Sequence, residues 1–560
     1  MLSRPVLIIT FALTLCAAAL LADPSINFSS SPLKLAANCT PVILAYILAL
    51  GLTRRPLTAA VVCTAVLFLI FSAHHLKLSH LSQPLIFADA FLAPQTITNW
   101  DLLSEYAPIG ALITLGLVLL IAVAISRFER PQPWWQGALL VLIGAVGLFT
   151  ISHPLDATSP LYGDRAHGAK PWATEAIAQD QGLMASLVSG ARSTKFDLPS
   201  VDHALIDDFV ASLPPQTTAL GAPAIKPDIV LWLGESFFDP SIIAGVDRCH
   251  YLPELCYMLQ STEEQSVIDV PTFGGNTTRT EFEVLTAIPY HDLGTKDYPY
   301  MSIVRQQHSS IAWSLARLGY TTTAIHPNNA SMWQRNRAMP LLGFDQFFSK
   351  QDFKSPKREG IFISDSTLLN QVTKTLEQDN SPQFIMAISM EGHGPFVKRD
   401  VLDTQRRDGI EAPSELDAKA AEEWREYIYH AQNAMTQMQR LQEYIKNRER
   451  PTLVVFFGDH LPKLKHIYKQ ITFVDGRADW QQDTPAFAFA NFPISSRWKP
   501  TASHQLGVWA LELTGLSPYT QYALLNEALA SIASDPTKQD ATVKALQLRQ
   551  LYAKAEQAIK

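Results

Sequence analysis

Long uncharged stretches dominate the first third of the chain, and each is long enough to cross a membrane. A helix rises ~1.5 Å per residue and the hydrocarbon core is ~30 Å thick, so about 20 apolar residues span it. The pattern predicts an N-terminal domain of five transmembrane helices over residues 1–155. The predicted spans are 5–22, 35–53, 56–76, 106–126 and 134–153. The first could instead be a cleaved signal peptide, but we expect a retained helix because further membrane segments follow it.

Beyond residue 155 the pattern changes to short apolar runs that alternate with helical segments. Runs of this kind are typical of buried strands, and their alternation with helices predicts a central, mostly parallel sheet covered by helices on both faces. The predicted strands are 228–236, 321–327, 384–390 and 452–460. The predicted helices are 278–288, 302–320 and 413–449. We expect a linker region at 156–225, the α/β domain at 226–535 and a C-terminal helix at 536–560.

Charge separates the same two regions. Of the 97 charged residues, twelve lie in the membrane domain, and the rest of the chain carries 38 basic and 47 acidic residues. That acidic balance argues against a nucleic-acid-binding protein, which normally presents a basic surface. The basic connections of the membrane domain alternate, with Arg4, the pair Arg54 and Arg55, and Arg127 with Arg130. Because basic loops stay in the cytoplasm, the α/β domain is predicted to lie outside it.

The α/β domain has two cysteines, Cys249 and Cys256, in the segment DRCHYLPELCYML. An oxidising exterior would let them pair. Seven residues of straight helix separate two Cα atoms by about 10 Å, which is too far for a disulfide. Pairing therefore requires a bend, for which Pro253 is suited. The alternative is two free buried thiols; given the topology, we expect the disulfide.

Polar residues collect where the predicted strands end, which is the edge at which open α/β sheets place their sites. Glu235 ends the first strand, and Asp459 and His460 end another. A buried carboxylate needs a partner, and two carboxylates with one imidazole suit a divalent cation. For any one of these residues a capping or ion-pair role is the simpler explanation. Three of them at strand ends favour a site for one divalent metal ion, for which we expect Mn²⁺, with Mg²⁺ and Zn²⁺ as alternatives.

Thr277 follows FGGN at the predicted start of a helix. Its hydroxyl would lie near free backbone N–H groups and the positive end of the helix dipole, which together attract anions. On local evidence alone the residue is an N-cap. A metal bound to its oxygen would lower the pKa of the hydroxyl and make Thr277 a nucleophile. Two further predicted strands are followed by His326 and His393.

The stretch GGNTTRTEFEVLTAIP resembles the nucleophile motif of the lipoteichoic acid synthase and phosphoglycerol transferase family, within the alkaline phosphatase/sulfatase-like superfamily. This resemblance implies that Thr277 is the nucleophile. The segments LGES and GDHLP match the family's metal-binding motifs. The implied metal ligands are Glu235, Thr277, Asp459 and His460.

The segments HPNNASMWQR and HGPF resemble the family's substrate-binding stretches. The implied substrate-binding residues are His326, Asn328, Trp333, Arg335 and His393. Asn328 stands where the Gram-positive members have an aspartate. The resemblance further implies that Arg335 binds a phosphate through two parallel hydrogen bonds, and that the imidazoles hold the head group or move protons.

The resemblance implies a phosphotransferase of the bacterial inner (cytoplasmic) membrane with an extracytoplasmic, periplasmic catalytic domain. Phosphatidylglycerol would be the donor, Thr277 would carry glycerophosphate covalently, and the acceptor would be a cell-envelope glycan or a polyglycerophosphate chain. Alternatives are a phosphoethanolamine transferase, a metal-dependent phosphodiesterase or phosphatase, and an inactive glycan-binding sensor. Sulfatase chemistry is disfavoured, because the Cys/Ser-x-Pro-x-Arg motif of those enzymes is missing around Thr277.

Overall fold

The computed structural model divides the chain into two compact units, the first of which is Met1–Phe196 and the second of which begins at Asp197. It describes residues 3–27, 30–81, 84–91, 109–153, 158–162, 174–193, 223, 225–290, 298–378, 380–520 and 522–523. The predicted C-terminal helix at 536–560 lies outside these ranges.

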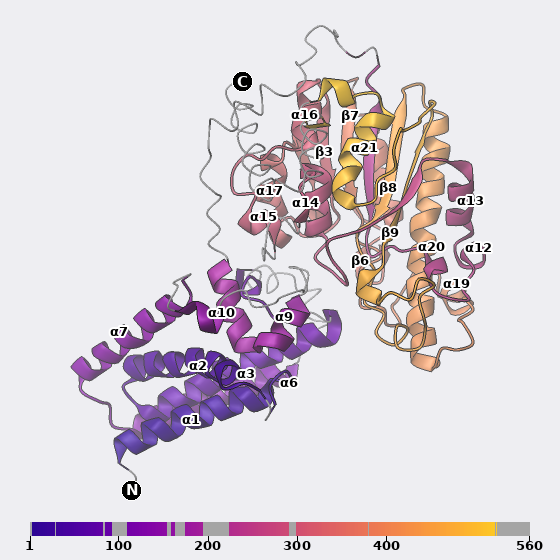
Figure 1. The fold of residues 1–560 in the computed structure, drawn as a ribbon. Coiled ribbons are helices and arrows are strands. Elements are labelled where there is room, and N and C mark those ends of the chain that lie inside the picture. The colour runs from indigo at the N-terminus through magenta and orange to yellow at the C-terminus, as the bar shows by residue number, and fades with distance from the viewer. Residues whose placement is uncertain are drawn as a thin grey trace. The chain divides into compact units, whose positions relative to one another are not determined.

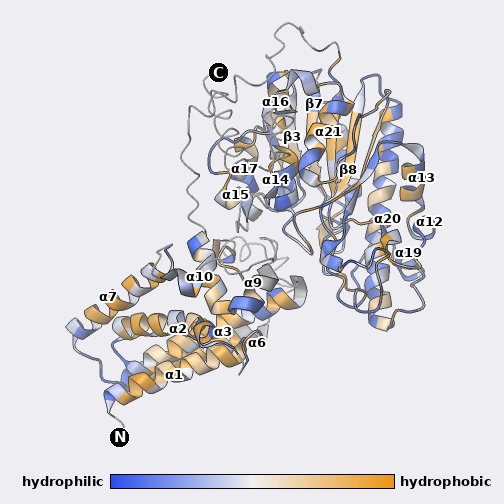
Figure 2. Ribbon diagram, in the orientation of Figure 1, coloured by the Kyte–Doolittle hydropathy of each residue, from blue (hydrophilic) through white to orange (hydrophobic). Residues whose placement is uncertain are grey.

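Long apolar helices make up most of the first unit (Figures 1 and 2). They are α1 (Arg4–Ala22), α2 (Pro32–Thr53), α3 (Pro56–Leu81), α6 (Ile109–Phe128) and α7 (Trp134–Ile151). By length and composition α1, α2, α3 and α7 can cross a membrane, and α6 contains a shorter apolar segment at Ile113–Phe128. Leu13, Leu120 and Leu142 are 65%, 68% and 60% exposed, which suits helices surrounded by lipid. The predicted membrane domain of apolar helices is confirmed.

Glycines allow α2 and α7 to pack closely. A Cβ atom on Gly51 would lie 2.5 Å from the backbone nitrogen of Val141, and one on Gly144 would lie 2.7 Å from that of Leu48. Both distances are shorter than van der Waals contact, so only glycine permits this approach, as is common between membrane helices.

Three shorter helices follow in the same unit: α8 (Ser159–Tyr162), α9 (Thr174–Gln181) and α10 (Leu183–Ser193). Asn38 on α2 links them to the membrane helices. Its amide nitrogen donates to the carbonyl oxygen of Gln181 at 2.7 Å, and its oxygen accepts from the N–H of Ala185 at 3.0 Å. The described part of the predicted linker region up to Ser193 therefore packs with the first unit.

The second unit is built on a seven-stranded sheet in the order β2-β9-β8-β1-β7-β3-β4 (Figure 1). Its strands are β1 (Asp228–Gly234), β2 (Gln265–Ile268), β3 (Thr321–Ile325), β4 (Gln346–Phe348), β7 (Gln383–Ile388), β8 (Thr452–Gly458) and β9 (Thr484–Ala490). The strands β4, β3, β7, β1 and β8 pair in parallel, while β9 runs antiparallel to β8 and β2. A two-stranded sheet of β5 (Arg358–Glu359) and β6 (Phe362–Ile363) lies apart from it.

Helices cover both faces of this sheet, as predicted. The helices of the second unit are α12 (Arg248–Tyr251), α13 (Pro253–Ser261), α14 (Thr278–Thr286), α15 (Pro299–Ser302), α16 (Ile311–Arg317), α17 (Arg335–Leu341), α18 (Asp365–Leu376), α19 (Thr404–Asp408), α20 (Ala418–Lys446) and α21 (Leu506–Leu513). One face of the central strands packs with α13, α18 and α20 in a continuous apolar core. On the other face lie α14, α16 and α21 (Figure 1).

The helix predicted at 302–320 is wrong in its first half. The structure has only α16 there, preceded by irregular chain. The hydroxyl of Ser310 caps the helix by accepting from the N–H of Trp313, and the N–H of His308 donates to the carbonyl oxygen of Leu341. This tertiary hydrogen bond holds the preceding residues in a non-helical path, although their sequence has helical periodicity.

Cys249 and Cys256 form a disulfide, with Cα atoms 5.1 Å apart. The two cysteines lie on separate short helices, because α12 ends at Tyr251 and α13 begins at Pro253. This break brings the Cα atoms within the range that a disulfide requires.

Candidate active site

The central strands place Glu235 and Asp459 side by side. Strands β1 and β8 pair in parallel with Gly234 opposite Gly458, so the next residue of each strand leaves the sheet at the same edge. Both glycines are required by close contacts. A Cβ atom on Gly458 would lie 2.0 Å from the carbonyl oxygen of Phe237, and one on Gly234 would lie 2.5 Å from the ring of Phe456.

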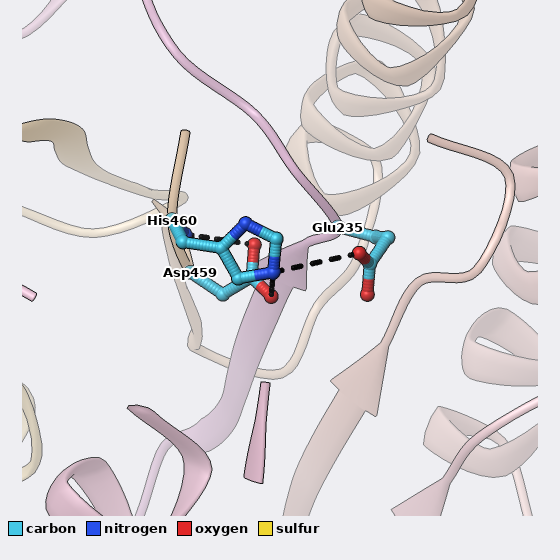
Figure 3. Close-up of side chains that lie close together, drawn as sticks. All are labelled: Glu235, Asp459 and His460. Atoms are coloured by element: carbon cyan, nitrogen blue, oxygen red, sulfur yellow. Dashed lines mark hydrogen bonds and ion pairs between the residues drawn. The ribbon is translucent and has the colours of Figure 1, made fainter. Parts of the chain in front are cut away.

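Glu235, Asp459 and His460 converge at this edge (Figure 3). One potential ligand atom from each residue lies within 4.8 Å of the other two, and all three residues are buried. Nε2 of His460 is 3.2 Å from Oδ2 of Asp459 and 3.8 Å from Oε1 of Glu235. The other oxygen of Asp459, Oδ1, accepts from the N–H groups of Ser236 at 2.7 Å and His460 at 2.9 Å.

The protonation state of the His460 ring indicates which kind of ligand the site requires. Nδ1 lies 3.0 Å from the carbonyl oxygen of Leu461. Because a carbonyl only accepts, Nδ1 carries the proton, and the neutral ring turns the lone pair of Nε2 toward the carboxylate oxygens. Among the described residues, neither Nε2 nor Oδ2 of Asp459 has a hydrogen-bond partner. Buried acceptors that face one another require a cation, and two carboxylates with one imidazole fit a divalent metal ion.

The acid–base shifts agree with this interpretation. Burial and the nearby charge of Asp459 raise the pKa of Glu235, against the effect of His393 and His460. Burial raises the pKa of Asp459 to about 7, although backbone hydrogen bonds, first of all from the Ser236 N–H, lower it. Burial lowers the pKa of His460. Each shift disfavours the charged form of the group. The carboxylate charges at this site are therefore unfavourable without a metal, and a bound cation would stabilise them.

Thr277 lies beside the carboxylates. Its hydroxyl donates to Oε2 of Glu235 at 3.2 Å, and the side chain is 3% exposed. It occupies the N-cap position of α14 but makes no side-chain capping bond there. The preceding loop reaches this point through positive φ angles at Gly274, Gly275 and Asn276. The structure thus directs the hydroxyl of Thr277 to the candidate metal site instead of to its own helix.

His326 lies at the end of β3 and is 2% exposed. Its Nδ1 is 3.2 Å from the carbonyl oxygen of Ile388, so Nε2 is the acceptor nitrogen of the neutral ring. Burial lowers its pKa far below the usual value, and the charges of Arg335 and His393 add to this. Asn328 follows in the same loop, where its amide oxygen accepts from the N–H of Asn329 at 2.7 Å.

Arg335 is fully buried and forms an ion pair with Glu281 of α14. Its Nε lies 3.1 Å from Oε2, and its Nη2 contacts Oε1. The hydroxyl of Tyr300 donates to Oε2 at 3.1 Å. The double hydrogen bond that we expected with a phosphate is therefore made with Glu281, so a phosphate contact would have to use the remaining N–H groups of Nη1 and Nη2. The ring of Trp333 lies 5.0 Å from the guanidinium carbon of Arg335.

Glu281 is not among the site residues predicted from the sequence, although a signal was present. Every residue of α14 is buried. A charged residue on a fully buried helix requires an ionic partner, and a helix that follows the candidate nucleophile is a natural place to look for one.

His393 is half-buried in the loop that follows β7. Its Nδ1 is 2.7 Å from the carbonyl oxygen of Gly394, and its ring packs 5.2 Å from that of Phe362. The preceding residue, Gly392, packs against Glu235, because a Cβ atom on Gly392 would lie 2.3 Å from the Glu235 carbonyl oxygen, so His393 lies next to the candidate metal site. The structure thus brings the predicted residues of four strand ends to one edge of the sheet.

Comparisons with known proteins extend these observations. Residues 227–515 match the family model described as Sulfatase. A putative cyclic beta-1,2-glucan modification protein of Rhizobium meliloti (strain 1021) is 30% identical over 268 residues, which are 48% of this chain and 40% of that protein. The chain thus spans less than half of the length of this relative.

Two solved structures are similar. The phosphoglycerol transferase GacH of Streptococcus pyogenes, in complex with sn-glycerol-1-phosphate, has a TM-score of 0.46 and 22% identity, covering 62% of this chain and 89% of that one. The integral membrane protein lipooligosaccharide phosphoethanolamine transferase A (EptA) of Neisseria meningitidis has a TM-score of 0.54 and 13% identity, covering 93% of this chain and 97% of that one. The latter similarity shows a shared fold of apolar helices followed by a sulfatase-like α/β domain.

Proposed function

Because the chain belongs to the sulfatase family, we propose that it is a membrane-anchored, metal-dependent phosphoglycerol transferase. It moves glycerophosphate from phosphatidylglycerol, through a covalent intermediate on Thr277, to a hydroxyl of a cell-envelope glycan or polyglycerophosphate chain. The observation that carries this proposal is the buried contact between the Thr277 hydroxyl and the Glu235 carboxylate, 3.2 Å long, beside the unsatisfied atoms of Asp459 and His460.

Glu235, Asp459, His460 and Thr277 would hold the metal ion. When bound, it supplies a positive charge that lowers the pKa of the Thr277 hydroxyl and neutralises charge on the phosphate. The side chains that surround this centre are already fixed. Both N–H donors to Oδ1 of Asp459 come from the backbone, so this carboxylate keeps its orientation whether or not the site is loaded.

The reaction has two displacements at phosphorus. In the first, Oγ of Thr277 bonds to the phosphorus while the bond to the diacylglycerol oxygen breaks. The hydroxyl proton leaves Thr277, and diacylglycerol departs with a proton on its oxygen. In the second, a hydroxyl of the acceptor bonds to the phosphorus, the bond to Thr277 breaks, and Thr277 regains a proton. We assign protonation of the departing oxygen to His393, which is the more exposed of the two imidazoles.

The other predicted residues would bind the donor. His326 is neutral and presents Nε2 as an acceptor, which suits a hydroxyl of the glycerol head group. Trp333 would form a wall against it. Because Glu281 occupies one edge of Arg335, we assign to Arg335 a contact with the phosphate through its remaining N–H groups. Its main role would be to fix α14 and hence Thr277.

Donor and acceptor have separate support. The assignment of phosphatidylglycerol as the donor is supported by the motif around Thr277, which resembles that of phosphoglycerol transferases. It is also supported by the apolar helices, which would keep the protein at a lipid surface. A glycan acceptor is supported by the relative named as a putative glucan modification protein. A threonine in place of the Cys or Ser of sulfatase motifs favours phosphoryl transfer.

The proposal is tested with the purified full-length protein in detergent, phosphatidylglycerol and Mn²⁺. We expect release of diacylglycerol and a glycerophosphate adduct on the peptide that contains Thr277, seen by mass spectrometry. Thr277→Ala should abolish both, and Thr277→Ser, which keeps a hydroxyl, is the matched control that should retain part of them. Full turnover by Thr277→Ala would refute the nucleophile assignment.

The alternatives give different products in the same assay. An adduct formed from phosphatidylethanolamine in preference to phosphatidylglycerol would identify a phosphoethanolamine transferase. Free glycerophosphate as the only product, in the presence of glucan, would identify a phosphodiesterase. Absence of both metal binding and turnover would leave the inactive sensor.

A further inference from the structure

The loop that carries His393 is fastened by Arg399. Nη2 of Arg399 donates to the carbonyl oxygen of His393 and, at 2.6 Å, to that of Pro395, while its Nε lies 3.2 Å from the Pro395 oxygen. The guanidinium carbon also stacks 5.1 Å from the ring of Phe362, which packs against the imidazole of His393. The Arg399 side chain thus contacts both the backbone of the loop and the Phe362 ring that packs against the His393 imidazole.

Arg399 is in turn fixed by a buried charge on α20. Its Nε lies 3.7 Å from Oε1 of Glu426, and the two side chains are 4% and 1% exposed. Glu426 also faces Nη1 of Arg407 at 3.4 Å and Nε2 of His430 at 3.3 Å. The guanidinium of Arg399 therefore has an ionic partner on a long, well-packed helix.

The start of the loop is held by the same face of α20. Glu391 accepts hydrogen bonds from the side-chain nitrogen of Asn433 at 2.6 Å and from the N–H of Asp365 at 2.7 Å, and its Oε1 lies 3.2 Å from Nδ1 of His430. Glu426, His430 and Asn433 are spaced four and three residues apart, so they share one helix face. Both ends of the loop, Glu391 and Arg399, are thus anchored to α20.

Stability alone does not account for this arrangement. Buried ion pairs contribute little more than well-packed apolar side chains of similar volume. The loop itself contains Gly392 and Gly394, which give it no rigidity of its own. What the anchors supply is a fixed path for the residues between them, and His393 lies in the middle of that path.

We propose that Arg399 is a positioning residue that places the imidazole of His393 at the transfer site by holding its backbone carbonyl. This inference rests on the proposed function of His393. The Nδ1 contact with the Gly394 carbonyl fixes the ring from the loop side, so that Nε2 is the nitrogen presented to the reacting groups. Misplacement of a catalytic group by about 1 Å can cost on the order of 100-fold in rate.

The test is a double-mutant cycle for diacylglycerol release by the full-length protein in detergent with phosphatidylglycerol. We expect Arg399→Gln to lower kcat about 100-fold with little change in KM, and His393→Ala to lower it at least as much. The double variant should be no slower than His393→Ala, because Arg399 acts through a side chain that is then missing. Losses that multiply in the double variant would overturn the proposal.

Two further variants control for folding. Arg399→Lys keeps a cation, but its single nitrogen cannot replace both Nε, which faces Glu426, and Nη2, which donates to the two carbonyls. This variant should keep the melting temperature and still lose most of kcat. Full activity of Arg399→Lys would also contradict the proposal. Arg448→Gln removes the ion-pair partner of the buried Asp228. Asp228 begins β1, about 20 Å along the strand from Glu235, so the effect of this variant should multiply with that of His393→Ala. If the wild type releases no diacylglycerol, the proposed function fails instead, independently of the cycle.

Discussion

Replacing Asp459 by Asn should stabilise the metal-free protein while abolishing its response to metal. In the wild type, Oδ1 accepts two backbone N–H bonds, whereas Oδ2 faces the lone pair of His460 Nε2 at 3.2 Å without a hydrogen-bond partner in the described part of the chain. An asparagine keeps an oxygen at the first position and puts an N–H donor at the second. The amide then donates to Nε2, and the two facing acceptors become a hydrogen bond.

The magnitude follows from these contacts. The new hydrogen bond contributes about 1 kcal/mol, and removing an unsatisfied buried acceptor contributes about 1–3 kcal/mol. The two N–H groups now donate to a neutral amide oxygen instead of a carboxylate, which reduces the stabilisation by roughly 1 kcal/mol. The net stabilisation is therefore about 1–3 kcal/mol, or ~2–6 °C in melting temperature for a domain of this size.

Metal reverses the order of the two proteins. A ligand at about 1,000 times its Kd stabilises the wild type by about 4.1 kcal/mol, which exceeds the advantage of the metal-free variant, and the variant has lost a negatively charged ligand. The assay is thermal unfolding of full-length wild type and Asp459→Asn, in chelator and in Mn²⁺. It should be run near pH 8, because the pKa of Asp459 in the folded protein is about 7 and a protonated carboxyl would imitate the amide.

One result would refute this reasoning. If Asp459→Asn melts below the wild type in chelator, the lone pairs at the centre are not the source of the instability. Equal stabilisation of both proteins by Mn²⁺ would place the metal elsewhere. Asp239→Asn, at a carboxylate paired with Arg248, is the matched control and should not gain stability.

Three further predictions concern stability. Glu281→Gln leaves Arg335 buried without its partner and should cost ~3–5 kcal/mol in thermal unfolding; unchanged melting would contradict the ion pair. Burial raises the pKa of Glu423 to about 7, above its unfolded value of ~4.3, so its contribution to stability declines as pH rises from about 4 to about 7. Glu423→Gln should flatten this decline by roughly 3–4 kcal/mol, and parallel pH profiles of the two proteins would count against it. Replacing Cys249 and Cys256 by Ser removes a short covalent loop and should cost about 2 kcal/mol, and reductant should lower the melting temperature of the wild type but not of this variant.

The sequence predicted the centre of the site because that part depends on local pattern and one topological rule. Buried strands that end in a carboxylate are recognisable along the chain, and the carboxyl ends of parallel strands meet at one edge. The register of Gly234 with Gly458 then brings Glu235 and Asp459 together. Nothing in this part requires knowledge of how distant side chains pack.

The surroundings of the site could not be predicted in this way. Glu281 and Arg335 are 54 residues apart, and neither segment contains a sign of the other. The anchoring of Arg399 by Glu426 likewise depends on how α20 packs under the loop. The helix prediction at 302–320 is wrong for the same reason. The hydrogen bond from His308 to Leu341 links segments that are distant in the sequence, and it keeps the residues before α16 out of the helix.

The residues of the candidate metal centre come from two distant parts of the sequence, so they are synthesised at different times. Ser236 and Asp459, which share a hydrogen bond, are separated by 223 residues. At about 5–20 residues per second, a ribosome needs roughly 10 to 45 s to pass from one to the other. The candidate metal centre is therefore incomplete until the chain has been made past β8, the last parallel strand, which Asp459 and His460 follow.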